Sequence, residues 1–504
     1  MNVKDLDKNF IVKKDNFLSY ISNIKESMSI DIFSISNVTI VNNPYASNFP
    51  KEFFIGDYKG DNNFFLFIKS SLKFYFKQMY LFFSYLISFF IYKLFYKKNT
   101  NIQNTIFIDI FFLVDNFIKD KEFNENYFGK LYKVLDKYNQ KYIFLPRLYG
   151  VGKNPFRLIK FFKIINRDKR DFLFEFELLS LKDFIDIFIM IVIYPFKTLR
   201  LKQKENTTID KLFNNELIRD INKQQFEAFS RYIYGKNIAK LKVEKIYSWS
   251  EFQVVERSFN YGVRVNNTDI KLYGCQFYLN YKTYFNTFIY DIDFLQQSSF
   301  HTILVNGKWY ILDREYIDYR VGVSLRYKEI FKYNISLNGS KILLLGSYIE
   351  KDTKYMLESV SSLDDVLFKN HPAVNIDKFG KLETNIKVVD NNIYELFEDT
   401  AIVISTASGT AVEAAACGIS VIIIASQDNL TANPLIEKGK GKIWDIAFTK
   451  DDVEKLYNKL LKYREENSKE IKEVALWYRD NFFVEPNEEN IVKAFELEKR
   501  NNKI

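Results

Sequence analysis

The order of apolar and polar positions predicts that strands and helices alternate along most of the chain. Short, nearly continuous apolar runs are typical of strands buried on both faces, and several precede segments with the 3.6-residue period of an amphipathic helix. Asn306 and Gly307 predict a hairpin turn. In the first half, the predicted strands lie within residues 104–114, 141–148, 268–279 and 300–313.

The alternation is clearest after residue 340. It predicts a parallel sheet covered by helices on both faces. Because ligands bind at the carboxyl ends of such strands, the residues that follow each strand are candidates for a functional site. The predicted strands are 341–349, 365–372, 401–406 and 421–426, and the predicted helices are 352–363, 392–400, 409–418 and a long stretch at 452–483.

The beginning of the chain has a different pattern. Residues 1–70 are irregular apart from one short predicted strand at 38–41. Residues 78–92 carry no charge and are flanked by lysines, but this run is shorter than the roughly 20 residues that span a bilayer. It is either a helix lying in the headgroup region or a buried core helix. A second apolar run, 187–196, precedes a basic cluster and favours peripheral membrane contact.

Composition narrows the class of protein. Hydrophobic residues make up 47% and charged residues 27% of the 504 residues, which is typical of a globular protein with two domains. The two cysteines and the lack of an apolar leader favour a reducing, cytoplasmic location. The two histidines, without a Cys-x-x-Cys pair, argue against a zinc site, and no metal is expected.

Charge and aromatic content indicate possible partners. The net charge of +9 fits phosphate-bearing substrates or an anionic membrane surface. The sequence has no nucleic-acid-binding signature, so no nucleic acid is expected. The 50 Phe and 34 Tyr reflect either a codon bias or extra aromatic surface for a lipid interface.

Two predicted strand ends carry polar residues suited to an anion. The first has Lys369 and His371, and Pro372 restrains His371 to an extended conformation at the mouth of the sheet. The second is residues 405–410, where Ser405, Thr406, Ser408, Gly409 and Thr410 precede a helix whose first N–H groups are unpaired. Simple capping by Ser408 is the alternative.

These segments resemble known motifs. SGTAVEAAACGISVIII (408–424) looks like the nucleotide-sugar-binding helix of GT-B glycosyltransferases. KNHP (369–372) and ISTASGT (404–410) resemble the His-Pro and Ser motifs of bacterial sialyltransferases and related CMP-sugar transferases. Residues 247–264, 270–276, 323–330 and 433–445 resemble bacterial surface-carbohydrate biosynthesis proteins, so the resemblance covers roughly 105–480.

The resemblance implies an α/β fold of two Rossmann-like domains facing across a cleft. The expected parts are an N-terminal extension with an apolar helix (1–100), an acceptor domain (101–335), a nucleotide-sugar domain (336–485) and a C-terminal helix and tail (486–504). It also implies that His371 and one of Ser405, Thr406 and Ser408 hold the donor phosphate. Glu413, in the first turn of the following helix, would lie near the ribose.

A transferase of this kind needs a general base on the acceptor side of the cleft. Glu251 is the first candidate because Trp249 beside it favours burial and a raised pKa, and Asp115, at a predicted strand end, is the second. The surface-carbohydrate family has Asn after the glutamate, whereas this chain has Phe252. His371 is a further catalytic candidate.

Charge stabilisation has its own candidates. Arg264 and Arg326 could bind carboxylates of donor or acceptor. Asp291 and Asp293 form an Asp-x-Asp pair, but they follow an aromatic loop and no strand end. A metal-independent reaction is therefore expected, with no cofactor beyond the nucleotide-sugar co-substrate.

The sequence thus predicts a glycosyltransferase located on the cytoplasmic side of the membrane and peripheral to it. The expected donor is a nucleotide sugar, first a CMP-linked, sialic-acid-like sugar and second a UDP or GDP sugar. The expected acceptor is a glycan or lipid-linked glycan of lipopolysaccharide, lipooligosaccharide or capsule. The alternatives are a polyol-phosphate transferase, a sugar epimerase of the same fold and a non-catalytic polysaccharide assembly protein.

Overall fold

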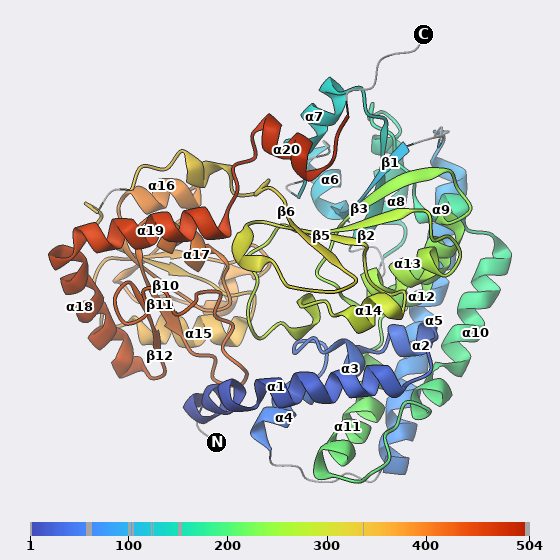
Figure 1. Cartoon of the computed structure of the whole chain (residues 1–504), viewed down its shortest axis with the longest axis horizontal. Coiled ribbons are helices and arrows are strands. Elements are labelled where there is room, and N and C mark those ends of the chain that lie inside the picture. Colours follow the sequence, from blue (N-terminus) through green and yellow to red (C-terminus); the bar gives the residue numbers. More distant parts are fainter. Residues whose placement is uncertain are drawn as a thin grey trace.

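The computed structural model describes residues 3–56, 63–98, 102, 105–121, 123, 125, 127–149, 154–335 and 337–498. Two parallel six-stranded sheets, each with helices packed against it, form two domains that lie side by side (Figure 1). This confirms the predicted class of two Rossmann-like domains facing across a cleft, the GT-B arrangement, with an N-terminal extension.

The first sheet has the strand order β2-β1-β3-β4-β5-β6. Its central strands are almost completely buried, as their apolar runs predict. The hairpin predicted at Asn306 and Gly307 is wrong: β5 and β6 are parallel, and residues 306–317 between them form a crossover. The strands are β1 Thr105–Leu113, β2 Tyr142–Tyr149, β3 Val243–Trp249, β4 Lys271–Gln276, β5 Thr302–Val305 and β6 Asp318–Val321.

Helices on both faces of this sheet complete the first domain. α12 and α13 approach closely at Gly235, which has no side chain. A Cβ atom at this position would lie only 2.4 Å from the Phe259 carbonyl oxygen. The elements are α6 Val114–Asp120, α7 Leu131–Lys137, α8 Arg157–Ile165, α9 Glu175–Leu178, α10 Leu181–Leu199, α11 Thr208–Arg219, η1 Asp220–Lys223, α12 Phe226–Ile238, α13 Val254–Arg264, η2 Phe285–Thr287, α14 Asp291–Leu295, η3 Lys308–Tyr310 and η4 Lys328–Phe331.

The second sheet has the order β12-β11-β10-β7-β8-β9. Its strands are β7 Lys341–Leu345, β8 Val366–Lys369, β9 Ile386–Val388, β10 Thr400–Ser405, β11 Ser420–Ile424 and β12 Trp444–Ala447. Its helices are α15 Glu350–Ser359, η5 Ile376–Phe379, α16 Ile393–Glu398, α17 Thr410–Ala416, α18 Lys450–Glu466 and α19 Ser468–Phe482.

The end of the chain returns to the first domain (Figure 1). Beyond α19, the helix α20 (Glu488–Ala494) packs near α7. The Tyr247 hydroxyl of β3 donates a 2.7 Å hydrogen bond to the Phe495 carbonyl oxygen, and Phe495 is completely buried. The two domains are therefore joined by the chain at two places.

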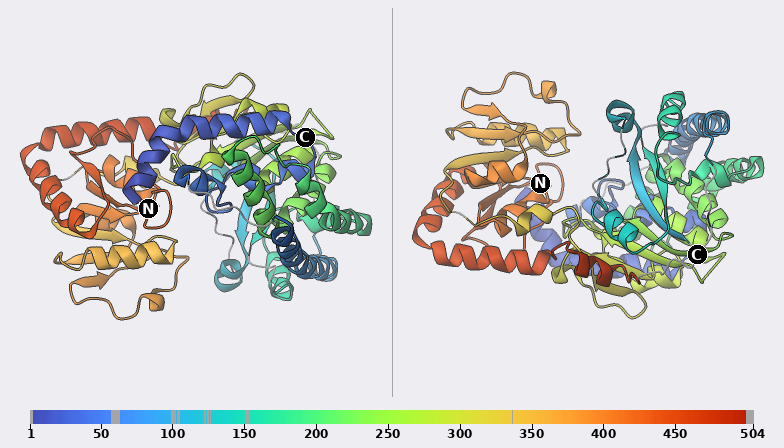
Figure 2. Two further views of the ribbon diagram at one scale, coloured as in Figure 1. Left: turned by 90° about the horizontal axis from the view of Figure 1, so that it is seen from below. Right: turned by 90° about the horizontal axis from the view of Figure 1, so that it is seen from above.

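The N-terminal extension is helical, which corrects the irregular start and the strand predicted at 38–41. The side chain of Asn37 accepts hydrogen bonds from the backbone N–H groups of Thr39 and Ile40 and so caps a helix over these β-branched residues. α1 runs beneath both domains (Figures 1 and 2), and Asp7 accepts a hydrogen bond from Thr431 N. The helices are α1 Val3–Ser27, α2 Ile32–Ile35, α3 Val38–Val41 and α4 Phe49–Ile55.

The apolar run near residue 80 lies in one long helix, α5 (Asn63–Phe95). By length and composition alone, α5 is sufficient to cross a membrane, yet 39% of its most apolar window is buried inside the protein. Its inner face holds Phe74 and Gln78, and the Gln78 amide donates to the Gln224 carbonyl oxygen at 2.8 Å. α5 is thus an integral part of the first domain.

Candidate functional site

A cavity of about 1300 Å³, open to solvent, lies between the two domains. Its walls come from the loops that follow the carboxyl ends of strands in both sheets, where parallel sheets usually bind ligands. Segments far apart in the sequence therefore meet here. The first domain contributes Tyr127, Trp249, Glu251, Gln253, Tyr278, Leu279, Asn280, Tyr281, Tyr284, Thr287, Arg326 and Tyr327, and the second contributes Tyr348, His371, Pro372, Ala407, Ser408, Gly409, Thr410 and Glu413.

His371 lies at this cavity, just beyond the end of β8. Its Nδ1 accepts a hydrogen bond from Ala373 N at 3.1 Å. Partial burial lowers the pKa of His371, which favours the neutral imidazole. Because Nδ1 is an acceptor, the neutral ring carries its proton on Nε2 and can donate it to a ligand.

The hydroxyl-rich turn after β10 lies at the same cavity as His371, through Ser408, Gly409 and Thr410. Gly409 sits against the other domain: a side chain there would meet Leu279 Cβ at 3.1 Å. A ligand phosphate at this turn would therefore meet the side chains of Ser408 and Thr410 beside the wall of the first domain.

Three predicted anion-binding residues do not line the cavity. Ser405 and Thr406 are buried, and their hydroxyls have no hydrogen-bond partner among the described residues. Ala407 has a left-handed φ of 48°, which turns the chain so that the cavity lining begins at Ala407. Lys369 donates instead to the Asn391 carbonyl oxygen at 2.7 Å. These three side chains thus lie outside the cavity lining to which His371 belongs.

Glu413 and Arg326 bring opposite charges to the cavity. The Glu413 carboxylate accepts a 2.5 Å hydrogen bond from the Tyr394 hydroxyl, and burial raises its pKa. The Arg326 guanidinium lies 5.3 Å from the ring centre of Trp249 and forms no ion pair within the described part of the chain. It is therefore available to a phosphate or carboxylate of a ligand.

Glu251 faces the second domain from the loop after β3. Burial raises the pKa of Glu251, the neighbouring Glu256 carboxylate raises it further, and Arg147 opposes both effects. Phe252, which follows Glu251, has a left-handed φ of 53° and is buried. A bulky residue in this conformation is strained, so the surrounding packing holds the loop in place.

A buried charged network lies behind this loop. Arg147 of β2 pairs with Glu256, contacts the Trp249 carbonyl oxygen and lies 3.3 Å from Asp109. Arg231 also pairs with Asp109, at 2.7 Å. The network fixes the backbone on either side of Glu251.

Asp115 and Arg264 lie elsewhere. Asp115 is in α6, exposed, and paired with Arg157 at 2.7 Å, so the structure does not place this second base candidate at the cavity. β1 ends at Leu113, before Asp115. Arg264 is buried against the Phe294 ring at 4.0 Å and donates to the Ser299 carbonyl oxygen. Its role is structural.

The Asp-x-Asp pair also lies away from the cavity. Asp291 accepts hydrogen bonds from the backbone of residues 315 and 316. Asp293 is buried between Lys25, at 2.8 Å, and Arg257, at 2.7 Å. Within the described residues, no group of three His, Cys, Asp or Glu side chains is arranged to hold a metal ion.

Sequence inspection missed the tyrosines of the cavity. Tyr278, Tyr281 and Tyr284 follow β4 at intervals of three residues and line the wall. Their position after a strand end was the available signal. Tyr284 and Tyr348 share a 2.6 Å hydrogen bond between their hydroxyl groups, and this bond joins the two domains.

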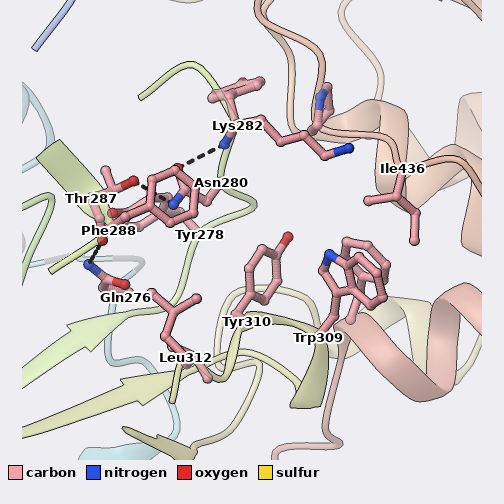
Figure 3. A pocket seen from close by; sticks show the side chains of 14 residues that line it. Gln276, Tyr278, Asn280, Lys282, Thr287, Phe288, Trp309, Tyr310, Leu312 and Ile436 are labelled. Atoms are coloured by element: carbon pink, nitrogen blue, oxygen red, sulfur yellow. Dashed lines mark hydrogen bonds between the residues drawn. The ribbon is translucent and has the colours of Figure 1, made fainter. Parts of the chain in front are cut away.

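A smaller pocket of about 590 Å³ adjoins the cavity behind the 278–287 loop (Figure 3). Asn280 donates to the Thr287 hydroxyl, and Gln276 donates to the Thr287 carbonyl oxygen at 3.0 Å, which holds this wall. Trp309 and Tyr310 form its floor. The described residues that line this pocket include no carboxylate or imidazole, whereas those of the larger cavity include both.

Comparison with known proteins gives only structural similarity. No protein-family model matches the chain, and no curated protein matches it in sequence. MurG of Acinetobacter baumannii is similar at 11% identity and a TM-score of 0.40, over 78% of this chain and 99% of that one. The UDP-GlcNAc 2-epimerase of Neisseria meningitidis gives 10% and 0.44, over 78% and 100%. The wall teichoic acid polymerase TagF gives 11% and 0.37, over 84% and 96%.

Proposed function

We propose that this chain is a glycosyltransferase that binds a nucleotide sugar on its second domain and an acceptor hydroxyl on its first. The observation that carries the proposal is the meeting of Glu251 with His371, Ser408 and Arg326 at one cavity between the carboxyl edges of two parallel sheets. A general base, a phosphate-binding loop and a free guanidinium are the groups that such a transfer needs.

The proposed step assigns each group a role. The acceptor oxygen attacks the anomeric carbon while Glu251 takes the hydroxyl proton, and the bond from that carbon to the phosphate oxygen breaks. The nucleotide leaves with the bonding electrons. Arg326 and the Nε2–H of His371 offset the charge that develops on the leaving phosphate. Glu413 binds a ribose hydroxyl. We propose a metal-independent transfer because Arg326, which forms no ion pair among the described residues, can offset the charge of the leaving phosphate.

The donor we favour is a CMP-linked, sialic-acid-like sugar, followed by a UDP or GDP sugar. Support comes from the juxtaposition of His371-Pro372 with Ser408, the segments that resemble the His-Pro and Ser motifs of CMP-sugar transferases. The acceptor we favour is a growing bacterial surface glycan, such as lipopolysaccharide, lipooligosaccharide or capsule. The reaction would take place on the cytoplasmic side of the membrane.

Ligand-dependent thermal unfolding tests this assignment, because a ligand that binds only the native state raises the unfolding temperature. The unfolding temperatures of the unaltered chain and of the variant His371→Ala are measured with CMP, UDP, GDP and CDP in turn. One nucleotide should stabilise the unaltered chain and, at the same concentration, stabilise the variant less. No stabilisation by any of the four would contradict the proposal.

Product analysis separates the remaining alternatives. The protein is incubated with the nucleotide sugar that carries the stabilising nucleotide, once with and once without a glycan acceptor. Transfer requires the acceptor, whereas an epimerase releases an altered sugar from the nucleotide sugar alone. A polyol-phosphate transferase would instead respond to CDP and its polyol conjugates. If His371→Ala and Ser408→Ala leave cellular polysaccharide unchanged, the chain is an assembly protein.

A further inference from the structure

The outer surface of the first domain has an unusually apolar face on α5. Its exposed large side chains recur at helical spacing and form one stripe along the whole helix, which is about 50 Å long. Phe76 is 78% exposed and Leu94 is 71% exposed. We call this stripe, together with the exposed apolar residues of α10, the α5–α10 face; its members on α5 are Phe65, Ile68, Leu72, Phe76, Phe83, Ile87, Phe90 and Leu94.

α10 extends the stripe into a surface. It lies antiparallel beside α5, because Phe196 contacts Phe67 near one end and Phe184 contacts Phe89 near the other (Figure 1). The Tyr75 hydroxyl of α5 donates to the Val192 carbonyl oxygen at 2.8 Å. The exposed apolar residues of α10 are Leu181, Ile185, Phe188, Ile189, Val192 and Phe196.

All charged side chains of α5 are positive. Lys69, Lys73, Lys77 and Lys93 are exposed, and the helix contains no Asp or Glu. Lys93 lies over the Phe89 ring at 5.6 Å, with its stem along the apolar surface. Aromatic side chains with flanking lysines are typical of helices that lie at the interface of an anionic bilayer.

A basic groove adjoins one end of the face. Its contact with α5 is direct: Lys163 lies over the Phe95 ring at 5.7 Å, and Asn166 donates to the Phe95 carbonyl oxygen. Asp168 is the one carboxylate among the described residues that line the groove, and it is paired with Arg170 at 2.8 Å. The other cations form no ion pair within the described residues, and the cationic lining is Lys121, Lys160, Lys163, Arg167, Lys169 and Arg170.

We propose that the α5–α10 face lies flat on an anionic phospholipid bilayer and that the basic groove contacts lipid phosphates at its edge. α5 does not span the bilayer, because its inner face is packed on the domain core through Phe74, Gln78 and Tyr92. The apolar stripe supplies insertion into the interface, and the groove supplies the preference for negative charge.

Vesicle flotation with the full chain tests the proposal. Phosphatidylcholine vesicles are compared with vesicles that also contain phosphatidylglycerol. We expect binding to the anionic vesicles, weakened about tenfold by Phe76→Asp or Phe83→Asp, which place a charge in the inserted stripe. The matched control Leu476→Asp, on the exposed side of α19, should bind like the unaltered chain. Circular dichroism checks that each variant is folded.

A second pair of variants tests the groove. Lys160→Ala with Arg167→Ala should remove most of the preference for phosphatidylglycerol, whereas Lys381→Ala with Lys387→Ala, on the exposed surface of the second domain, should keep it. Equal binding to both vesicle types would overturn the anionic assignment. Binding that is insensitive to Phe76→Asp and Phe83→Asp, or a dimer in solution that these variants dissociate without any vesicle binding, would overturn the proposal.

Discussion

The hydroxyl groups of Tyr284 and Tyr348 meet at 2.6 Å across the cleft, one from the loop after β4 and the other from the loop after β7. The ring of Tyr45, from the N-terminal extension, lies 4.9 Å from that of Tyr284 and 5.6 Å from that of Tyr348. Three parts of the chain therefore meet at one edge of the cavity, and this contact restrains the opening of the two domains.

Tyr348→Phe removes this interdomain hydrogen bond and keeps the ring. We expect a loss of about 0.5–1.5 kcal/mol in the free energy of unfolding. Hydrogen exchange should become faster in residues 281–288 and 346–349, because the domains separate more readily. Denaturant titration and exchange mass spectrometry measure both effects. Tyr149→Phe, at an exposed tyrosine outside the cavity, is the control; equal effects of the two changes would show that the contact does not restrain the domains.

Glu251→Gln should lower kcat by roughly 10²–10⁴, the usual contribution of a general base, and leave nucleotide binding nearly unchanged. Asp115→Asn is the matched control because Asp115 is exposed, paired with Arg157 and outside the cavity. Its activity should equal that of the unaltered chain. If Asp115→Asn loses activity while Glu251→Gln keeps it, the assignment of the base is wrong.

The pH dependence follows from the burial of Glu251. Burial and the Glu256 carboxylate raise the pKa of Glu251, and a base acts only in its ionised form. Activity should therefore fall as the pH drops through this raised pKa, so the acid limb of kcat/KM lies above the range of an ordinary glutamate. The limb should disappear from the residual activity of Glu251→Gln. An acid limb that is the same in both proteins would assign it to another group.

His371→Ala should weaken nucleotide binding about tenfold, which corresponds to about 1.4 kcal/mol. The reason is the loss of the Nε2–H donor at the cavity. Lys369→Ala is the informative control, because this neighbouring cation donates to the Asn391 carbonyl oxygen and does not line the cavity. Calorimetric titration of both variants with the nucleotide measures the two affinities. A larger effect of Lys369→Ala would mean that the bound state rearranges this loop.

Much of the fold could be predicted because parallel strands buried on both faces leave continuous apolar runs. β7, β10 and β11 are such runs, and each was visible in the sequence. The helix at 38–41 was not, because its β-branched residues favour a strand and only the capping hydrogen bonds of Asn37 decide otherwise. The sequence left α5 as either buried or interfacial, and the structure shows one buried and one exposed face.

The loops of the site could be predicted more completely than the side chains that line it. That the loops with His371 and Ser408 line one cavity follows from the rule for carboxyl ends of strands, although β7 lies between β8 and β10. Which hydroxyl of residues 405–410 faces the cavity depends on the left-handed conformation of Ala407, which no local pattern signals. The tyrosines after β4 also follow a strand end, but only the order of the strands in space shows that this end faces the second domain.

Asp293 anchors the N-terminal extension to the first domain, so Asp293→Ala should destabilise the protein strongly. The carboxylate is buried between Lys25 of α1 and Arg257 of α13, and these cations hold the pKa of Asp293 well below its usual range despite burial. Removing it leaves two buried positive charges unpaired, for which we expect a loss of about 3–5 kcal/mol in the free energy of unfolding. Asp115→Ala breaks an exposed pair and should lose less than about 1 kcal/mol.

The sign of the pH effect gives a further check on Asp293. Because its folded pKa is depressed, the stabilisation is complete above the unfolded value of about 3.9 and is lost as the pH falls below it. Unfolding titrations from neutral to acidic pH should therefore show a drop in stability for the unaltered chain that is smaller in Asp293→Ala. Faster hydrogen exchange in α1 of the variant would locate the effect, and an unchanged α1 would place the anchoring elsewhere.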